Sequence, residues 1–270
     1  MPTPFYHLSI GEELLAPGKL PEHTRRCLLR YRAAFLLGNT APDVQTISHQ
    51  SRQSTHFYAL PLDANTQEPW AALWEVHPEL SRVGLFDAQA AFLAGYLCHL
   101  QADWLWVKDI FEPVFGKSAK WGMLQERLYI HNVLRAAIDR DVLEELDPLV
   151  GDALQQATPQ NWLPFVEDVY LCRWRDFLTE QLGPGAAAQT VEVFAARQGI
   201  PVEAFYRLLD SERLMAQQVF SHFSRLQIEA YRRQVIAENV SLLAHWLPNC
   251  RATARSPRRG YTSPLHGESA

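Results

Sequence analysis

The stretch GYLCHLQADWLW, Gly95–Trp106, decides the fold because it places a histidine and an aspartate in an otherwise strongly apolar segment. His99 and Asp103 are four residues apart, so a helix puts both on one face. A buried carboxylate is costly unless it has a partner, so Asp103 needs a counter-charge, a cavity or a bound cation. We therefore expect a buried central helix from Asp87, its N-cap, to about Phe111, with other segments completing the polar pair.

Apolar residues recur at helical spacing along the chain, and no segment combines strand alternation with a hairpin turn. The chain of 270 residues shows no internal repeat and no strong linker. The pattern therefore predicts one all-α, multi-helix domain, residues 1–250, around a buried central helix. Residues 251–270, rich in arginine, proline and glycine, are predicted to be a disordered tail. Small side chains in the central helix predict close helix packing: Ala90, Ala91, Ala94, Gly95, Cys98 and Ala102.

Flanking segments predict further helices and one long irregular stretch. We expect a short helix over Ser9–Leu15 with Ser9 as its N-cap, a helix from Pro21 to Gly38, and a long one over Ser211–Leu247. The stretch from Gly38 to Pro69 is rich in proline, serine and threonine and is predicted to be a functional loop.

Composition limits the classes of function. The formal net charge of −5 leaves no field that would attract nucleic acid. The four cysteines form no C-x-x-C pair, and no apolar run reaches the ~18 residues of a membrane span. With no basic and apolar leader at the N-terminus, these features predict a soluble, cytoplasmic protein.

Candidate metal ligands gather in the first half of the chain. Imidazole and carboxylate ligands suit zinc, and a set of this size would fit two or three ions. Each also has an ordinary structural interpretation, because His99 with Asp103 could be a buried ion pair and His131 a core histidine. The candidates are His7, Asp43, His56, His99, Asp103, Asp109 and His131.

Four short motifs in this order resemble a known family. They are His7 before an amphipathic helix, the segment Gly38–Asp43, the segment Ser54–Phe57, and His99 with Asp103. This order resembles the zinc-dependent phospholipase C and single-strand nuclease superfamily, and it is similar to the catalytic domain of glycosylphosphatidylinositol-specific phospholipase D.

The resemblance implies an all-α fold with one to three zinc ions at the base of a cleft. Asp43, His56, His99 and Asp103 would bind one zinc, and Asp103 would bridge to a second zinc bound by His7. Asp43 would also orient the attacking water, which makes Asp43 and Asp103 the candidate catalytic residues.

Two positions depart from the family's pattern. Asp109 stands where the family has a histidine, and Arg135 stands where a carboxylate should follow His131 by four residues. The site at Asp109 and His131 is therefore expected to be weakened, altered or empty. Arg135 would instead bind a substrate phosphate or form a surface salt bridge. Trp104 would form an aromatic wall for a quaternary ammonium headgroup or belong to the core.

The leading interpretation is a metal-dependent phosphodiester hydrolase that uses zinc-activated water. A phospholipid-like or small phosphodiester substrate is favoured over nucleic acid, because no basic stripe is interleaved with aromatic residues. Two alternatives remain open: a helical binding or scaffold protein with a partial metal site, and a nuclease. The sequence does not define an oligomeric state.

Overall fold

The computed structural model describes residues 1–63, 65–82, 86–183 and 185–247. All regular secondary structure in these ranges is helical, which confirms the predicted all-α class. The predicted tail at residues 251–270 lies outside the described residues, and the domain boundary at residue 250 stays a prediction. Within the described ranges, no helix has the length and apolar character needed to cross a membrane.

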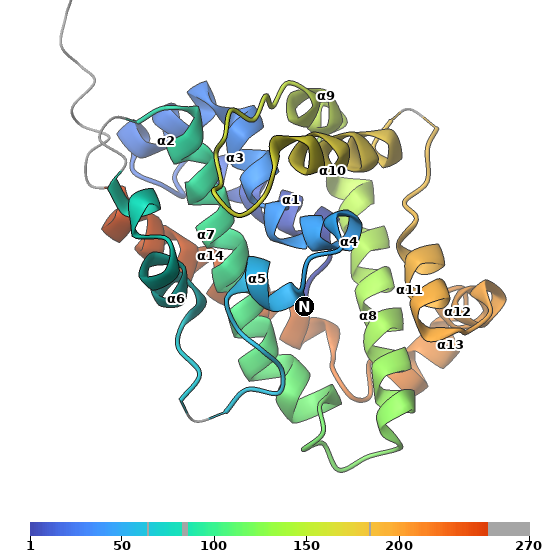
Figure 1. Ribbon diagram of the computed structural model, residues 1–270. Coiled ribbons are helices and arrows are strands. Elements are labelled where there is room, and N and C mark those ends of the chain that lie inside the picture. The colour runs from blue at the N-terminus through green and yellow to red at the C-terminus, as the bar shows by residue number, and fades with distance from the viewer. Residues whose placement is uncertain (64, 83–85, 184, 248–270) are drawn as a thin grey trace, which may run out of the picture.

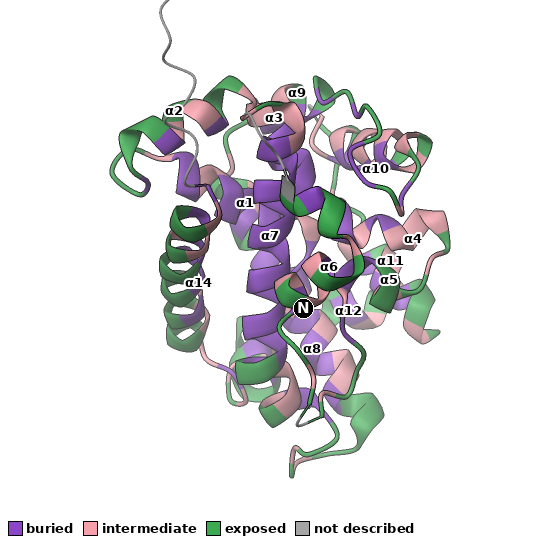
Figure 2. Ribbon diagram, turned by 60° about the vertical axis from the view of Figure 1, so that its left-hand side comes forward, coloured by how far each residue is buried: buried purple, intermediate pink, exposed green. Residues whose placement is uncertain are grey.

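The central helix α7, Ala88–Trp106, runs through the middle of the molecule (Figure 1) and is almost entirely buried (Figure 2). It begins as predicted, because the Asp87 side chain accepts a hydrogen bond of 2.9 Å from the Ala90 amide. At its end the chain continues as a π-helix, η3, Val107–Phe115. Helix α7 is therefore surrounded by other elements along its length.

Helices α3, Arg32–Gly38, and α7 pack backbone against backbone through two glycines. A Cβ atom on Gly38 would lie 2.0 Å from the Phe92 carbonyl oxygen, and one on Gly95 would lie 2.1 Å from the Phe35 carbonyl oxygen. Only hydrogen atoms fit at these two positions. This close approach brings the end of α3 against the turn of α7 that carries His99.

Three further helices pack around the site-bearing part of α7: α1, Pro4–Leu15, α8, Leu124–Glu145, and α14, Arg225–Trp246. One apolar core draws on helices from both halves of the chain. The remaining elements are α2, Glu22–Arg30; η1, Ala41–Val44; α4, Gln45–Ser48; α5, Arg52–His56; α6, Pro69–Val76; η2, Pro78–Arg82; α9, Val150–Gln155; α10, Asp168–Gln181; α11, Thr190–Gln198; α12, Val202–Leu209; α13, Glu212–Leu214; and η4, Met215–Val219.

The first helix begins earlier than predicted. Its N-cap is Thr3 rather than Ser9, and Pro4 occupies the first helical turn, where its fixed φ favours helix entry. Ser9 lies inside the helix and donates to the Tyr6 carbonyl oxygen at 2.8 Å. His7 therefore lies on a helix, which fixes the direction of its side chain.

Two other predicted helices are interrupted, and the predicted irregular stretch contains short helices. The helix expected from Pro21 to Gly38 is divided at Tyr31 into α2 and α3. The helix expected over Ser211–Leu247 is interrupted before Ser224, which starts α14 with a capping box. The stretch from Gly38 to Pro69 contains the short helices η1, α4 and α5, too short to show a helical period.

We expect Gly95→Ala to lower the free energy of unfolding by about 3 kcal/mol, because the added methyl group forces α3 and α7 apart. Urea denaturation monitored by circular dichroism measures this loss. Gly151→Ala is the matched control, because a Cβ atom on that helical glycine would lie 3.1 Å from the Leu182 Cβ and no closer than 3.7 Å to a backbone atom. Equal stability of both variants would contradict backbone contact between α3 and α7.

Candidate metal centre

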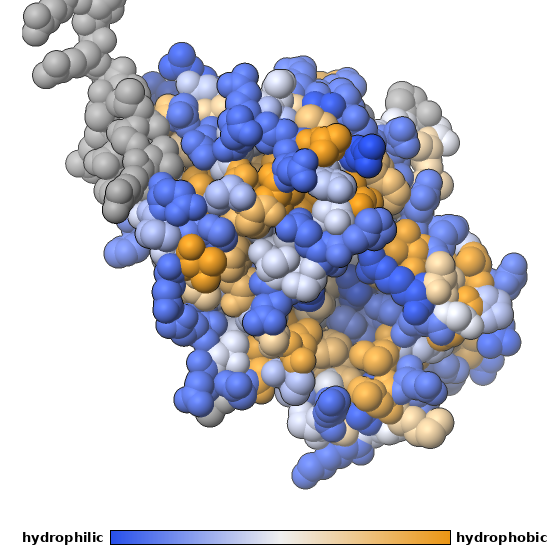
Figure 3. Space-filling view, viewed as in Figure 1, coloured by the Kyte–Doolittle hydropathy of each residue, from blue (hydrophilic) through white to orange (hydrophobic). Residues whose placement is uncertain are grey.

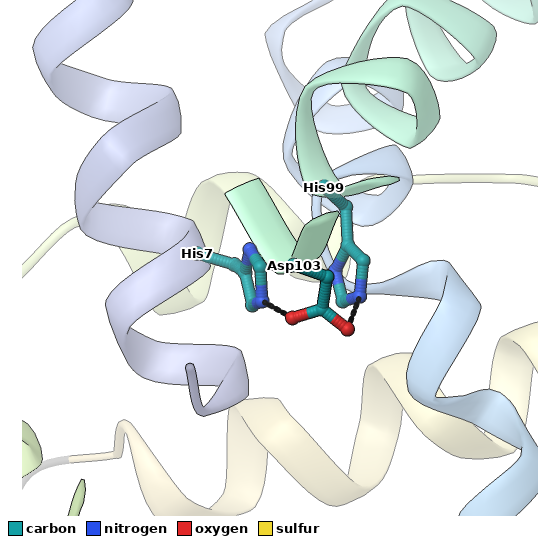
Figure 4. Close-up of side chains that lie close together, drawn as sticks. All are labelled: His7, His99 and Asp103. Atoms are coloured by element: carbon teal, nitrogen blue, oxygen red, sulfur yellow. Dashed lines mark ion pairs between the residues drawn. The ribbon is translucent and has the colours of Figure 1, made fainter. Parts of the chain in front are cut away.

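Three buried side chains from two helices meet at the centre of the fold (Figure 4). Helix α7 contributes His99 and Asp103, and α1 contributes His7, all at most 1% exposed. His7 Nε2 lies 3.4 Å from Asp103 Oδ1, and His99 Nε2 lies 3.7 Å from Asp103 Oδ2. The two imidazole rings stack with centroids 3.7 Å apart. Both rings therefore direct a nitrogen at one carboxylate.

Two residues from the 41–56 segment complete the group. The Nε2 atom of His56, on α5, lies 3.6 Å from Asp43 Oδ1, 3.3 Å from Asp103 Oδ2 and 3.3 Å from His99 Nε2. Ligand atoms at 2.0–2.1 Å from a tetrahedral zinc are separated by about 3.3–3.4 Å. The separations of 3.3–3.7 Å come near this value, and the donor atoms form two groups that could each hold an ion: Asp43, His56 and His99, and His7, His99 and Asp103.

Hydrogen bonds outside this group orient the two histidine rings. His99 Nδ1 lies 2.9 Å from the Asn39 carbonyl oxygen, which can only accept, so Nδ1 carries the proton. Its Nε2 atom is then left with a free lone pair facing the carboxylates. His56 Nδ1 is held by the Thr55 hydroxyl at 3.0 Å. Such outer contacts are typical of metal-binding histidines.

His7 supplies a second test of fit. Both of its ring nitrogens and Asp103 Oδ1 are buried, yet none has a hydrogen-bond partner among the described residues. Buried polar atoms without partners are rare and costly. A cation between His7 Nε2 and Asp103 Oδ1 would satisfy both atoms, so the residues present also fit a second metal ion.

Arg52 is part of the site and was not predicted from the sequence. Its Nη2 atom donates to Asp103 Oδ2 at 2.5 Å and to the Tyr58 hydroxyl at 2.8 Å. Its Nη1 atom lies 2.8 Å from His56 Nε2. Arg52 stands four residues before His56 on α5, a helix too short for this spacing to show in the sequence, so no local signal identified it.

The protonation states that the site favours are those that zinc requires. Burial alone would raise the pKa of Asp103, but the charge of the Arg52 guanidinium holds it well below its usual value. The pKa of Asp43 is lowered in spite of burial, chiefly by its hydrogen bond with His56. Burial lowers the pKa of His7 to about 4 and also lowers that of His56. Ionised carboxylates thus face neutral imidazoles.

The structure does not bring Asp109 and His131 into this group. Asp109 is exposed on η3, where Gln234 donates to its carboxylate at 3.3 Å. His131 is buried on α8 and accepts a 2.9 Å hydrogen bond from the Trp106 indole nitrogen. Within the described ranges, the groups of potential ligands close enough to share an ion contain only His7, Asp43, His56, His99 and Asp103.

The two candidate substrate-binding residues lie on different sides of the group. Arg135 is half-buried on α8, donates to Asn132 at 2.9 Å and stacks over the Phe194 ring at 4.3 Å. Trp104 is only 7% exposed, and its ring centroid lies 5.6 Å from that of Tyr58. Figure 3 shows a hollow with a hydrophilic floor near the centre of the face turned to the viewer, between α5 and α8. Arg135 therefore keeps unused donors, whereas Trp104 is packed.

The chain was then compared with known proteins. The model of a family described as zinc dependent phospholipase C matches residues 6–106. This match confirms the resemblance predicted from the sequence. The segment contains all five residues of the group and ends before Asp109 and His131. No curated protein and no solved structure matches the chain significantly.

A buried carboxylic acid on α8 supports the segment that carries His7. Asp139 accepts hydrogen bonds from the hydroxyls of Thr3, the N-cap of α1, and Thr190. Burial raises its pKa to about 6, in spite of these two hydrogen bonds. The folded protein therefore retains a proton on Asp139 at pH values where the unfolded chain has lost it.

We expect the free energy of unfolding to fall by about 2 kcal/mol, through Asp139 alone, as the pH rises from 4 to 7. The sign follows because its pKa is higher in the folded state, so ionisation above pH 6 opposes folding. Asp139→Asn should remove this contribution, which urea denaturation at several pH values measures. The exposed Asp152→Asn is the control, and an unchanged pH profile in Asp139→Asn would contradict the assignment.

Proposed function

We propose that the protein is a zinc-dependent phosphodiester hydrolase that acts on a phospholipid-like or small phosphodiester substrate. One observation carries this proposal: two groups of three donor atoms that could each hold an ion, Asp43 with His56 and His99, and His7 with His99 and Asp103, lie side by side and share His99. The family match over the same segment supports it independently. The cytoplasmic location expected from the sequence stays a prediction.

Each residue has a separate role in the proposed site. Asp43, His56, His99 and Asp103 would hold one zinc, and His7 with Asp103 a second. Bound zinc lowers the pKa of a water ligand and polarises a phosphoryl oxygen. Asp43, at the edge of the group, would accept a hydrogen bond from the attacking water and orient it. Arg135 would neutralise a phosphate oxygen through its free N–H groups.

Arg52 and zinc would use the same two atoms, Asp103 Oδ2 and His56 Nε2. The guanidinium therefore supplies positive charge to Asp103 when no metal is bound. Metal binding would break these contacts and leave the N–H groups of Arg52 free to donate to a substrate phosphate. Tyr58, which accepts from Arg52 at 2.8 Å, would keep the side chain beside the site.

A binding protein that has lost hydrolysis is the second candidate. The exposed position of Asp109 favours this candidate, because the resemblance implies a metal ligand at that position and the side chain is exposed instead. A nuclease is less favoured, because the chain has a net charge of −5.

Zinc analysis of the full chain tests the proposal. We expect at least one equivalent of zinc, lost in His99→Ala together with at least about 100-fold of the activity on bis(p-nitrophenyl) phosphate. Asp109→Asn is the matched control and should leave the zinc content unchanged. Less than one equivalent, unaffected by His99→Ala, would end the metalloenzyme proposal. Zinc binding without turnover of any phosphodiester would favour the binding protein.

Arg52→Met should raise the affinity for zinc and lower the free energy of unfolding of the metal-free protein. Without the competing guanidinium, we expect zinc to bind about tenfold more tightly, as measured by competition with a chelator. The metal-free protein should lose about 3 kcal/mol of unfolding free energy, because Asp103 keeps its buried charge without the arginine. The exposed Arg213→Met is the control. Weaker zinc binding in Arg52→Met would refute the competition between Arg52 and the metal.

A further inference from the structure

A cavity beside the proposed zinc site is lined by two arginines, Arg135 and Arg197, and the proposed hydrolysis uses only the first of them. It lies between the start of α1, the η1–α4 segment, and helices α8, α10 and α11 (Figure 1). Asp43 and Arg135 line it next to the zinc ligands, and Arg197 lines it on the exposed face of α11. Its volume of ≈ 70 Å³ is larger than one water molecule needs, so a small polar group can enter.

The two arginines are not neutralised within the protein. Among the described residues, no carboxylate lies within 4.0 Å of the Arg135 or Arg197 nitrogens. Arg135 uses one nitrogen to donate to Asn132, and its buried Nε has no partner. Arg197 donates to the Thr46 hydroxyl at 3.2 Å. A guanidinium has five N–H donors, so most of them remain available for an anion.

The walls of the cavity hold these donors in place. The Arg135 guanidinium lies over the Phe194 ring at 4.3 Å, which fixes its plane and leaves its edges free. Trp174 and Phe177 from α10 form the apolar side. The negative groups near Arg135 are Asp43 and Asp103, both proposed zinc ligands, and Asp139, which burial keeps largely protonated below pH 6. Zinc bound at Asp43 and Asp103 would offset the repulsion that these two carboxylates exert on an anion.

The surroundings of Trp104 do not suit a cationic headgroup. Trp104, the candidate wall for a quaternary ammonium, packs against Tyr58 and Val107. The Arg52 guanidinium already lies 5.4 Å from the Tyr58 ring centroid. A choline group placed there would meet this positive charge at close range. The arginine therefore disfavours a cation at Trp104.

Resting on the proposed function, we propose that this cavity binds the headgroup of the substrate and selects one with a second anionic group, such as a phosphomonoester. Arg135 binds the phosphate next to the zinc ligands, and Arg197 binds the second anion at the exposed end. The substrate class is thus an anionic phosphodiester with a phosphorylated polyol headgroup rather than a choline ester.

Calorimetric titration of the zinc-loaded full chain tests this inference with four probes: glycerol 1,3-bisphosphate, glycerol 1-phosphate, phosphocholine and inorganic phosphate. We expect the bisphosphate to bind at least about tenfold more tightly than the other three, because the second phosphate adds charge-assisted hydrogen bonds. Arg197→Gln should remove this preference without changing the affinity for glycerol 1-phosphate. Arg135→Gln should weaken both glycerol phosphates.

The exposed Arg207→Gln on α12 is the matched control and should bind all four probes as the unaltered chain does. Equal affinities for both glycerol phosphates, or an unchanged preference in Arg197→Gln, would overturn the inference. Inorganic phosphate binding as tightly as the bisphosphate, or phosphocholine binding most tightly, would also overturn it.

The titration, read together with zinc content and diester hydrolysis, distinguishes failure of this inference from failure of the proposed function. Zinc binding and diester hydrolysis without a bisphosphate preference would overturn the headgroup assignment alone. An Arg197-dependent bisphosphate preference in a chain that binds no zinc and hydrolyses no diester would overturn the hydrolase proposal and support the cavity as an anion site.

Discussion

The burial of one carboxylate constrains the whole structure. Asp103 is 1% exposed on the central helix, and a buried charge is tolerated only when other groups satisfy it. Its partners come from three separate parts of the chain: His7 on α1, Arg52 and His56 on α5, and His99 one turn earlier on α7. The N-terminal helix and the 41–56 segment must therefore dock against α7 in one arrangement.

The close packing of α3 on α7 serves the site as well as the core. Gly38 and Gly95 let the two backbones touch, which carries Asn39 to the turn of α7 that holds His99. The Asn39 carbonyl then fixes the proton on His99 Nδ1 and directs Nε2 towards the carboxylates. A larger residue at either glycine would change the separation of the helices and the tautomer of a proposed zinc ligand.

Local patterns predicted the parts of the fold and site that depend on local spacing. The Asp87 cap and the pairing of His99 with Asp103 follow from helix geometry, and the motifs around Asp43 and His56 gave the family. Arg52 was missed because an arginine in a polar loop looks solvated until the loop is placed on α7. Its partner Asp103 is distant in sequence, so only tertiary structure reveals the pair.

Asp109 was expected near the ligands through the resemblance, yet helix geometry argues against it. Six residues along an α-helix correspond to a rotation of about 240° from Asp103, and the π-helix from Val107 changes the direction further. The carboxylate consequently faces solvent beside Gln234. The sequence alone could not show this, because the π-helix appears only in the structure.

The positive charge that balances Asp103 bears on how a metal would bind there. Arg52 lies 2.5 Å from the Asp103 carboxylate and 2.8 Å from His56 Nε2, so zinc held by these two residues, as we propose, would have to replace the guanidinium. Zinc binding would then be an exchange of one cation for another, and the displaced guanidinium would remain next to the proposed phosphodiester site. Competition for Asp103 would thus lower zinc affinity and at the same time make a phosphate-binding group available.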